Sequence, residues 1–300
     1  MLAGGTGGAK LARGMQDVVG PENLVVVANT GDDIEIHGAY VSPDPDLVSF
    51  WLADAIDERG WGLRDDTFNT MEGLRKLGVE VWFNLGDRDL AWCIERRRLL
   101  DEGSSATAVL ARLNEAMNIR AKVLPMSDDP VRTWVRGDSG WHSFQEFMIR
   151  GQGKGMIDGL EFRGAEQARP SAEVLAAIAD ARAIVIGPSN PLASIGPILA
   201  IPDMREALAA AAAPVVAVSP IVGGEVLKGP TASFMAFAAL ECNATGVRDF
   251  YGELLDGLVS DEPAPAGGPQ ALRIDTRMFD AASRRRVAEQ VLAFADFLAR

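Results

Sequence analysis

The chain begins with the stretch Met1-Leu2-Ala3-Gly4-Gly5-Thr6-Gly7-Gly8-Ala9-Lys10, in which four of the five residues from position 4 to position 8 are glycine. A glycine-rich turn after a strand lets the backbone approach an oxygen-rich ligand and point its N–H groups at it. The helix that we expect from about Gly8 would add the positive end of its dipole, with Lys10 in its first turn. The stretch therefore predicts the first strand, loop and helix of an α/β fold, and a candidate phosphate-binding loop.

Neither of two standard nucleotide-binding motifs matches this glycine loop. A Walker A loop has glycine before its lysine and Ser or Thr after it, whereas Ala9 and Leu11 flank Lys10 here. A dinucleotide fingerprint would have glycine where Lys10 stands and an acidic residue where Asn29 follows the next strand. Two alternatives stay open, a phosphate-binding loop without a standard motif and a tight strand-to-helix turn without a ligand.

Further along the chain, short apolar and β-branched runs predict strands that are buried on both faces, as in a parallel sheet. Helical stretches separate them, and this alternation predicts an α/β fold with a Rossmann-like, doubly wound, mostly parallel sheet. Ligands of such sheets bind at the carboxyl ends of the strands, so the loops after these runs should face one crevice. The expected strands are residues 24–28, 121–124, 183–186, 214–218 and 272–275, and the expected helices are residues 46–58, 171–180, 205–212 and 281–298.

Two segments depart from this alternation. Residues 131–149 alternate between apolar and polar side chains around Gly137-Asp138-Ser139-Gly140, which predicts an antiparallel hairpin. Residues 50–120 are expected to be a mostly helical insertion, and their four tryptophans either line a flat aromatic pocket or pack a helical layer. We expect a single α/β domain over residues 1–300, with a helical subregion at about residues 46–120.

Charge and composition argue against several classes of partner. The net charge of −13 argues against nucleic acid, because phosphate backbones are held by clustered Lys and Arg. The basic run Arg96-Arg97-Arg98 is followed by acidic residues and is expected on a solvated helix face. No apolar segment reaches the ~18 residues of a membrane span, and no signal peptide is recognisable. Cys93 and Cys242 are far apart, which predicts free thiols and a cytoplasmic protein.

Acidic residues gather after the second expected strand. Asp32 and Asp33 follow its end, and Asp44 and Asp46 come shortly afterwards in Ser42-Pro43-Asp44-Pro45-Asp46. Carboxylates so close in sequence are hard to hold together unless a cation or hydrogen-bond donors intervene. A bound Mg²⁺ would explain the cluster, because Mg²⁺ prefers oxygen ligands. For a single residue the alternative is a cap for the helix at 46–58, made by Ser42 or Asp44.

Eight motifs occur along the chain in this order: GGTGGAKL (4–11), NTGDD (29–33), SPDPD (42–46), DTF (66–68), LGDRD (85–89), LPMSDDPV (124–131), GPSNPLASIGPILAIP (187–202) and SPIVGG (219–224). Together they closely resemble the 2-phospho-L-lactate transferase family, from Leu2 to about Tyr251. The resemblance implies an enzyme of coenzyme F-420 biosynthesis that transfers a phosphorylated three-carbon acid from a guanosine-diphosphate-linked donor to the deazaflavin alcohol FO, releasing GMP. It also implies a Rossmann-like core, Mg²⁺ as cofactor, and a homodimer whose partners are small molecules.

The resemblance further implies roles for individual residues. Asp46 and Arg88 would bind FO, and Asp46 is hypothesised to accept the proton of the FO hydroxyl. The candidates for catalysis and for Mg²⁺ binding are Asp32, Asp44 and Asp46, so that Asp46 carries two assignments. Asp128 would either bind the donor or order its loop. The other candidates for binding the donor and its phosphates are Gly4, Gly5, Thr6, Gly7, Gly8, Lys10, Gly187, Ser189 and Asn190.

Two features depart from the family pattern. Only Met1-Leu2-Ala3 precede the glycines, so either the first strand is very short or the start of the chain is late. Gly31 in NTGDD is the second departure, and we expect it only to increase backbone freedom.

Two rival functions are compatible with the same type of sheet. An NAD-linked oxidoreductase is disfavoured by the incomplete fingerprint and by the lack of a catalytic histidine, since His37 and His142 are each expected to be structural. A non-catalytic nucleotide-sugar-binding regulatory protein would share the glycine loop and the GPSN turn, but not SPDPD together with LGDRD. We therefore prefer the enzyme, while the choice between phospholactate, phosphoenolpyruvate and phosphoglycerate stays open.

Overall fold

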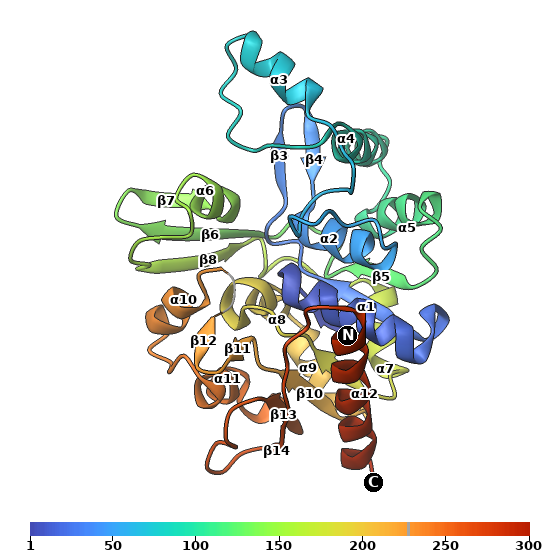
Figure 1. Ribbon diagram of the computed structural model, residues 1–300, viewed down its shortest axis with the longest axis vertical. Helices are drawn as coiled ribbons and strands as arrows, with labels where there is room; N and C mark the ends of the chain where they lie inside the picture. Colours follow the sequence, from blue (N-terminus) through green and yellow to red (C-terminus); the bar gives the residue numbers. More distant parts are fainter. Residues whose placement is uncertain (227–228) are drawn as a thin grey trace.

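The fold is built on one parallel sheet. A computed structural model describes residues 1–226 and 229–300, and its seven-stranded sheet has the order β14-β13-β10-β9-β1-β2-β5 (Figure 1). All neighbouring strands in it pair in parallel, which confirms the predicted Rossmann-like α/β fold. The strands are β1 (Leu2–Ala3), β2 (Val25–Ala28), β5 (Lys122–Pro125), β9 (Ile184–Ile186), β10 (Val215–Val218), β13 (Gly257–Ser260) and β14 (Gln270–Arg273).

Most of the expected strands lie where the sequence pattern placed them. The strands expected at 24–28, 121–124, 183–186 and 214–218 are found within one residue of these bounds. The last strand was expected at 272–275. The structure places it as β14, two residues earlier, where it pairs with β13 from Gly257↔Gln270 to Ser260↔Arg273. Its partner β13 was not expected, since Gly-Leu-Val-Ser is too short to stand out as an apolar run.

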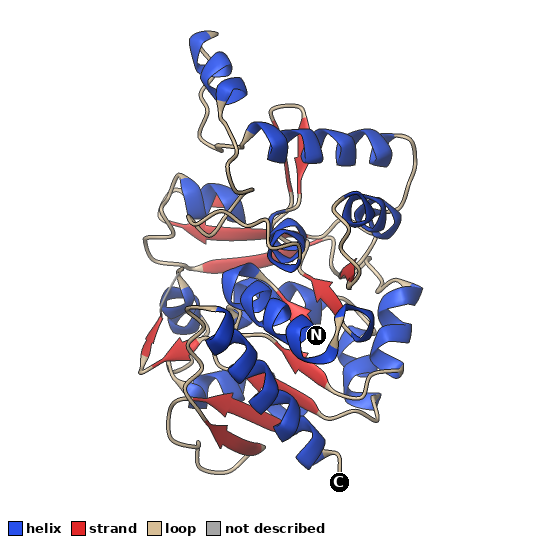
Figure 2. Cartoon of the chain, turned by 45° about the vertical axis from the view of Figure 1, so that its right-hand side comes forward, coloured by secondary structure: helices blue, strands red, loops and turns tan. Residues whose placement is uncertain are grey.

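Helices cover both faces of this sheet, and the alternation of strand side chains assigns each residue to one face. Leu2 and Val27 belong to one buried core, whereas Ala3 and Val26 belong to the other. The first core is closed by α7 (Ala172–Ala179), α8 (Gly196–Ala200), α9 (Met204–Ala210), α10 (Thr231–Phe237) and α11 (Ala244–Tyr251). The second is closed by α1 (Gly5–Val19), α2 (Pro43–Leu52) and α12 (Ala281–Leu298), and Figure 2 shows the long α12 in front of the sheet.

Two helices differ from the sequence prediction by three residues or more. The helix α1 begins at Gly5 rather than near Gly8, so the second half of the glycine loop is helical. The helix expected at 46–58 is α2, which begins at Pro43, a residue suited to the first turn of a helix, and ends at Leu52. The chain leaves the helical conformation there, because Asp54 has a φ of 52°. Asp44 and Asp46 therefore lie in the first turn of α2.

A third core holds the predicted helical insertion together. The hairpin of β3 (Ile34–Ile36) and β4 (Ala39–Val41), which was not predicted, extends from the sheet and packs with three further helices. Figure 1 shows α3 at the far upper end of the molecule. Long loops at 53–68 and 77–86 separate the helices, so the insertion is less helical than expected. The helices are α3 (Asn69–Lys76), α4 (Asp87–Asp101) and α5 (Ala106–Ala116).

The hairpin expected over residues 131–149 is confirmed for residues 132–143, where it forms part of a three-stranded antiparallel sheet, but residues 144–149 are a helix and not a strand. Its turn is where the sequence placed it, because Gly137 pairs with Gly140. The hairpin ends at Ser143, whose side chain caps α6 (Phe144–Ile149) in a capping box with Glu146. The strands are β6 (Arg132–Gly137), β7 (Gly140–Ser143) and β8 (Gly159–Arg163), in the order β7-β6-β8.

The remaining elements are short. A small hairpin pairs β11 (Ile221–Val222) with β12 (Glu225–Val226) after the end of β10. Single helical turns cover Pro21–Asn23, Pro191–Ile195 and Gly252–Leu254. No helix in the described ranges combines the length and the apolar character that crossing a membrane requires.

Close packing accounts for most of the glycines in the first loop. A Cβ atom added at Gly7 would overlap the carbonyl oxygen of Pro188, and one at Gly8 would lie 2.7 Å from the Ser189 Oγ. Gly31 is confined in the same way, because a Cβ there would overlap the Thr133 Oγ1, so the expectation that Gly31 only adds backbone freedom is wrong. Gly5 differs from these positions, since its φ is 60° and an added Cβ would meet no atom within 4 Å.

This packing predicts that Gly7→Ala destabilises the protein. The added methyl group would force the glycine loop and the loop after β9 apart, and overpacking of this kind costs about 1–3 kcal/mol. The matched control is Gly73→Ala within α3, where an added Cβ meets no atom within 4 Å and a helical alanine gains about 0.5–1 kcal/mol. Urea unfolding of both variants measures the difference, and equal stabilities would contradict the packing argument.

Candidate active site

The two loops that flank the switch point of the sheet are in contact. From β1 the chain continues to β2 on one side, while β9 lies beside β1 on the other, so a ligand crevice is expected between β1 and β9. The Gly4 N–H donates to the Ser189 Oγ at 3.1 Å, and this hydroxyl donates to the Gly4 carbonyl at 2.5 Å. Asn190 caps the next helical turn, since its Oδ1 accepts from the Leu192 and Ala193 N–H groups. The predicted donor-binding loops are therefore brought together, with Ser189 and Asn190 engaged in holding their shape.

The amino end of α1 faces the acidic cluster. The Gly5 N–H donates to the Asp44 Oδ1 at 2.7 Å, and Gly4 provides no side-chain cap. An anionic group at this position is favoured by the partial positive charge of a helix amino end. Gly5 and Asp44 thus connect the predicted phosphate loop directly to the predicted metal site.

Asp32 and Asp44 form a buried pair joined by one amide group. The Asn29 Nδ2 donates to the Asp32 Oδ1 at 3.2 Å and to the Asp44 Oδ2 at 2.9 Å. The Asn29 Oδ1 accepts from the Gly31 N–H at 2.8 Å, which fixes the orientation of the amide. In the described part of the chain neither carboxylate has an ion-pair partner. Two carboxylates therefore share one neutral donor group away from water.

The electrostatics of this pair follow from its burial. Burial raises the pKa of Asp32 well above its usual range, and the neighbouring Asp44 carboxylate raises it further. Burial also raises the pKa of Asp44 to about 6, although hydrogen bonds from Asn29 and Gly5 oppose the shift. Such a pair is stabilised in its ionised form by a cation placed between the oxygens.

Asp33 has hydrogen-bond donors of its own, separate from those of the Asp32–Asp44 pair. Its carboxylate accepts from the Ser42 Oγ at 2.7 Å and from the Tyr40 hydroxyl at 3.0 Å. Burial raises the pKa of Asp33 to about 7, against the opposing effect of the Arg132 guanidinium. Ser42 therefore serves Asp33, and the predicted alternative that its side chain caps α2 is wrong.

Asp46 is separated from Asp32 and Asp44 by the direction of its side chain. Its carboxylate forms a buried bidentate ion pair with Arg96, and its Oδ1 also accepts from the Trp92 Nε1 at 2.8 Å. Asp46 therefore faces α4, and both of its oxygens already have donors. The predicted assignments of Asp46 to FO and to Mg²⁺ stay predictions.

The prediction that Arg96 is exposed to solvent is wrong. The run Arg96-Arg97-Arg98 was expected on a solvated face, but the Arg96 side chain is only 5% exposed, against 36% for Arg97 and 48% for Arg98. The signal was available, because Trp92, Cys93 and Leu99 share a helical face with Arg96 and are apolar. A basic residue within an apolar stripe predicts a buried acidic partner, which is Asp46.

The donor set of Asp32 and Asp44 fits Mg²⁺. This ion is usually bound by one or two carboxylates together with substrate phosphates, and it keeps the rest of its shell as water. A second group, in which Asp46, Asp89 and Cys93 offer atoms within 4.8 Å of one another, is found in the described residues. It fits Mg²⁺ poorly, since it contains a soft thiol ligand and already faces the Arg96 guanidinium.

The LGDRD motif forms a reciprocal pair of helix caps. Asp87 accepts from the Thr70 N–H at 2.9 Å and from the Asn69 N–H at 3.0 Å, which caps α3. Asp66 of the DTF motif caps α4 in turn, because it accepts from the Arg88 and Asp89 N–H groups. The exposed Arg88 guanidinium donates to the Arg64 carbonyl at 3.2 Å, and its predicted contact with FO stays a prediction.

Two other predicted ligands are engaged elsewhere in the structure. The Lys10 Nζ donates to the Met278 carbonyl at 3.2 Å and lies 5.9 Å from the centre of the Trp51 ring, so it points toward the loop before α12. The Asp128 Oδ1 accepts from the Thr107 N–H at 2.7 Å in the first turn of α5. This contact supports the alternative in which Asp128 orders its loop, while binding of the donor by Lys10 or Asp128 stays a prediction.

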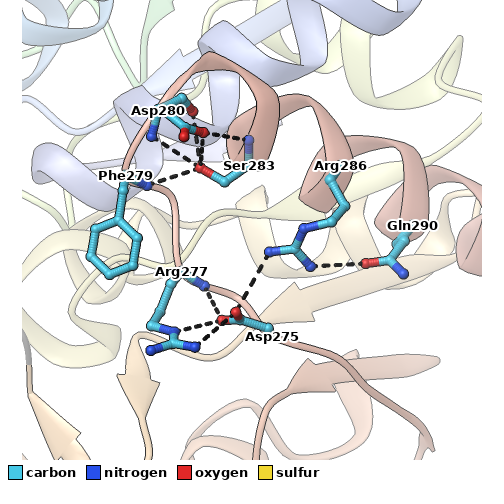
Figure 3. A network of polar contacts seen from close by, with 7 residues as sticks. All are labelled: Asp275, Arg277, Phe279, Asp280, Ser283, Arg286 and Gln290. Atoms are coloured by element: carbon cyan, nitrogen blue, oxygen red, sulfur yellow. Dashed lines mark hydrogen bonds and ion pairs between the residues drawn. The ribbon is translucent and has the colours of Figure 1, made fainter.

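The loop after β14 follows the carboxyl end of that strand, and its charged side chains pair with one another and with α12, as Figure 3 shows. Asp275 accepts from the Arg277 guanidinium at 2.8 and 3.0 Å and lies 3.9 Å from an Arg286 nitrogen. Asp280 and Ser283 form the capping box of α12. Both arginines therefore have an acidic partner.

Among the described residues, each of Trp61, Trp82 and Trp92 packs against a phenylalanine, and no ring contact joins two tryptophans of the helical region. Trp92 is buried and packs edge-on against Phe50 at 5.6 Å between ring centres. Trp51 lies between Lys10 and the Arg284 guanidinium, which is 5.0 Å from its ring. Trp61 is 41% exposed and stacks with Arg59 at 4.5 Å. Packing therefore accounts for Trp92, whereas Trp61 has an aromatic surface available to a ligand.

The chain matches a family of known enzymes over nearly its whole length. Residues 1–284 match the family model described as 2-phospho-L-lactate transferase CofD. The chain belongs to this family. Membership makes it a transferase of coenzyme F-420 biosynthesis, and it argues against the NAD-linked oxidoreductase and the non-catalytic regulator.

Named relatives carry two different activities. The 2-phospho-L-lactate transferase of Methanosarcina mazei is 39% identical over 300 residues, which cover 97% of this chain and 98% of the relative. That of Methanosarcina acetivorans is 40% identical over 304 residues, covering 99% and 98% of the two chains. The phosphoenolpyruvate transferase of Streptomyces griseus is 39% identical over 310 residues, covering 99% and 98%.

A solved structure supports the fold of this transferase. A member of the UPF0052 family from Bacillus halodurans superimposes with a TM-score of 0.61 over 97% of both chains. Its sequence is only 17% identical, so the likeness extends to the fold alone.

The buried Asp89 of the transferase predicts a pH-dependent stability. Burial raises its pKa to about 7, and the nearby Asp46 carboxylate adds to the shift. The folded state therefore binds this proton more tightly than the unfolded chain, so stability should fall by at most about 1.4 kcal/mol per pH unit as the pH rises from about 4 to 7.

Asp89→Asn removes this cost, and it should stabilise the protein more at pH 8 than at pH 5. Urea unfolding at the two pH values measures the difference. The exposed Asp138→Asn, in the β6–β7 turn, controls for the loss of one carboxylate. An equal effect of Asp89→Asn at both pH values would show that the buried carboxylate does not titrate in this range.

Proposed function

We propose that this transferase moves a phosphorylated three-carbon acid from a guanosine-diphosphate-linked donor to FO, with Mg²⁺ held by Asp32 and Asp44. The observation that carries the proposal is the Asp32–Asp44 pair, which lies beside the amino end of α1 at the switch point of the sheet. A diphosphate placed at the open Gly5 position would meet both the helix amino end and the ion.

The proposed reaction is an in-line displacement at phosphorus. The FO hydroxyl oxygen forms a bond to the phosphorus of the three-carbon acid, the bond to the GMP oxygen breaks, and the hydroxyl proton is released. Such transfers depend chiefly on positioning and charge neutralisation. When bound, Mg²⁺ would neutralise charge on the diphosphate oxygens.

The residues of the chain divide this work between the two substrates. Asn29 orients the two carboxylates that hold the ion, and the N–H groups of the glycine loop face the donor. Asp46 and Arg88, on the side of α4, are the proposed binding groups for FO. The flat ring of FO would pack against an exposed aromatic side chain, and Trp61 on the loop between α2 and α3 is exposed.

Turnover assays test the reaction directly. The purified full chain is incubated with FO, Mg²⁺ and guanosine-diphosphate-linked phospholactate, phosphoenolpyruvate or phosphoglycerate in separate tubes. We expect GMP release and a deazaflavin product whose mass identifies the acid carried by the preferred donor. If none of the three donors gives a product, the proposed function is wrong.

The metal assignment is tested by removing one carboxylate at a time. Asp32→Asn and Asp44→Asn should each lower kcat by roughly 10²-fold or more, because the charge that holds the ion is lost. Their activity should also require more Mg²⁺ than the wild type does. Asp138→Asn serves as the surface control, and wild-type Mg²⁺ dependence in both site variants would contradict the assignment.

A further inference from the structure

Arg96 lies at the centre of a buried polar cluster that joins three elements. Its Nη1 donates to the Asp46 Oδ2 at 2.9 Å and to the Tyr40 carbonyl at 3.1 Å, and its Nη2 donates to the Asp46 Oδ1. Trp92, one turn earlier on α4, donates its Nε1 to the same Asp46 Oδ1. Arg96 of α4 is therefore fastened to Asp46 of α2 and to Tyr40 of β4.

Stability alone does not explain an ion pair at this place. Removing two charges from water is costly, and well-packed apolar residues of similar volume often serve equally well or better. A bidentate pair instead fixes the relative orientation of its two side chains. The cavity beside Arg96 is lined on one side by apolar residues, among them Leu100, Val109 and Leu110, so the guanidinium is directed toward its polar partners and not into this space.

The first turn of α2 is held from two sides. Asp44 accepts from Gly5 and Asn29 on the side of the sheet, while Asp46 is held by Arg96 and Trp92 on the side of α4. Asp44, of the proposed donor and metal site, and Asp46, of the proposed acceptor region, are therefore only two positions apart on the same helix. Whatever fixes Asp46 also fixes where the acceptor lies relative to the metal pair.

The geometry leaves a defined function for Asp46. A carboxylate has about four positions at which it can accept a hydrogen bond. Two guanidinium donors and the Trp92 N–H take three of them, and the fourth, on Oδ2, is not used by any described residue. An acceptor hydroxyl would be directed by the orientation of this one oxygen.

We propose that Arg96 is a positioning residue for the acceptor, which orients the free position of Asp46 toward the FO hydroxyl. The inference rests on the proposed function, because it takes FO as the ligand of Asp46. It predicts that Arg96 governs the use of FO, while donor binding at the glycine loop is left nearly unchanged.

Two substitutions of Arg96 test the proposal in the full chain. Arg96→Met keeps much of the apolar stem and removes the donors, so it should lower kcat/KM for FO by roughly 10²-fold or more. Arg96→Lys keeps the charge but cannot bind both Asp46 oxygens and Tyr40 at once, so it should recover part of this loss. For both variants we expect the KM of the donor to stay within about threefold of the wild-type value.

A neighbouring arginine provides the matched control. Arg97 follows on the same helix, but it is exposed and pairs with Glu35 and Asp101 at the surface. Arg97→Met should leave the kinetics with both substrates unchanged. Circular dichroism melting shows whether each variant is folded, and if Arg96→Met does not fold, Arg96→Lys carries the comparison with Arg97→Met.

A direct binding measurement separates this inference from the proposed function. The dissociation constant of FO is measured by fluorescence for the wild type and for both Arg96 variants, without any donor. If the wild type is active and the folded Arg96 variants have unchanged kinetics with FO, the inference alone is overturned. It is also overturned if the KM values of the variants for FO and for the donor rise equally. A wild type that binds FO but releases no GMP overturns the proposed reaction, and FO affinity then decides the role of Arg96. A wild type without FO affinity overturns both.

Discussion

The requirement that buried carboxylates be compensated governs the organisation of this transferase. Four aspartates enter the interior near the end of β2, and each cannot stay ionised there without a partner. Hydroxyl groups and Arg132 serve Asp33, while Arg96 and Trp92 serve Asp46. Asp32 and Asp44 share the amide of Asn29, and Asp44 also accepts from the Gly5 N–H. Among the described residues Asp46 has an arginine as its ion-pair partner, whereas Asp32 and Asp44 have none, and for this reason we propose these two as the ligands of Mg²⁺.

Packing within the fold accounts for most of the glycines in the first loop, without reference to a ligand. Gly7 and Gly8 are required because the loop after β9 lies directly against them, and Gly4 exchanges hydrogen bonds with Ser189. The switch point of a doubly wound sheet brings these two loops together, since β1 and β9 are neighbours whose helices leave on opposite faces. The two loops are therefore in close contact, and Gly5 is the position in the glycine loop where an added Cβ would meet no atom within 4 Å.

The relatives show what overall similarity leaves undecided. Transferases named for 2-phospho-L-lactate and for phosphoenolpyruvate resemble this chain to nearly the same degree, at 39–40% identity over almost the full length. These acids differ by few atoms, so the choice between them depends on contacts at the reacting end of the donor. In the function that we propose, this end lies between the Asp32–Asp44 pair and the side of α2 that faces α4, and the residues there would set the substrate preference.

The sequence by itself determined the parallel sheet, the hairpin with its turn at 137–140 and the family, because buried strands and motifs of fixed spacing are local patterns. It also determined that Asp32 and Asp44 belong to one acidic cluster. Only the tertiary structure decided how the cluster is divided. Asp46 lies two residues from Asp44 yet faces the opposite side of α2, and its partner Arg96 is fifty residues away in a run that looks solvated. The direction of a side chain at the start of a helix depends on where that helix begins, and the start of α2 lies three residues before the position that periodicity indicated. Pairing between distant helices is set by packing, which no local pattern records.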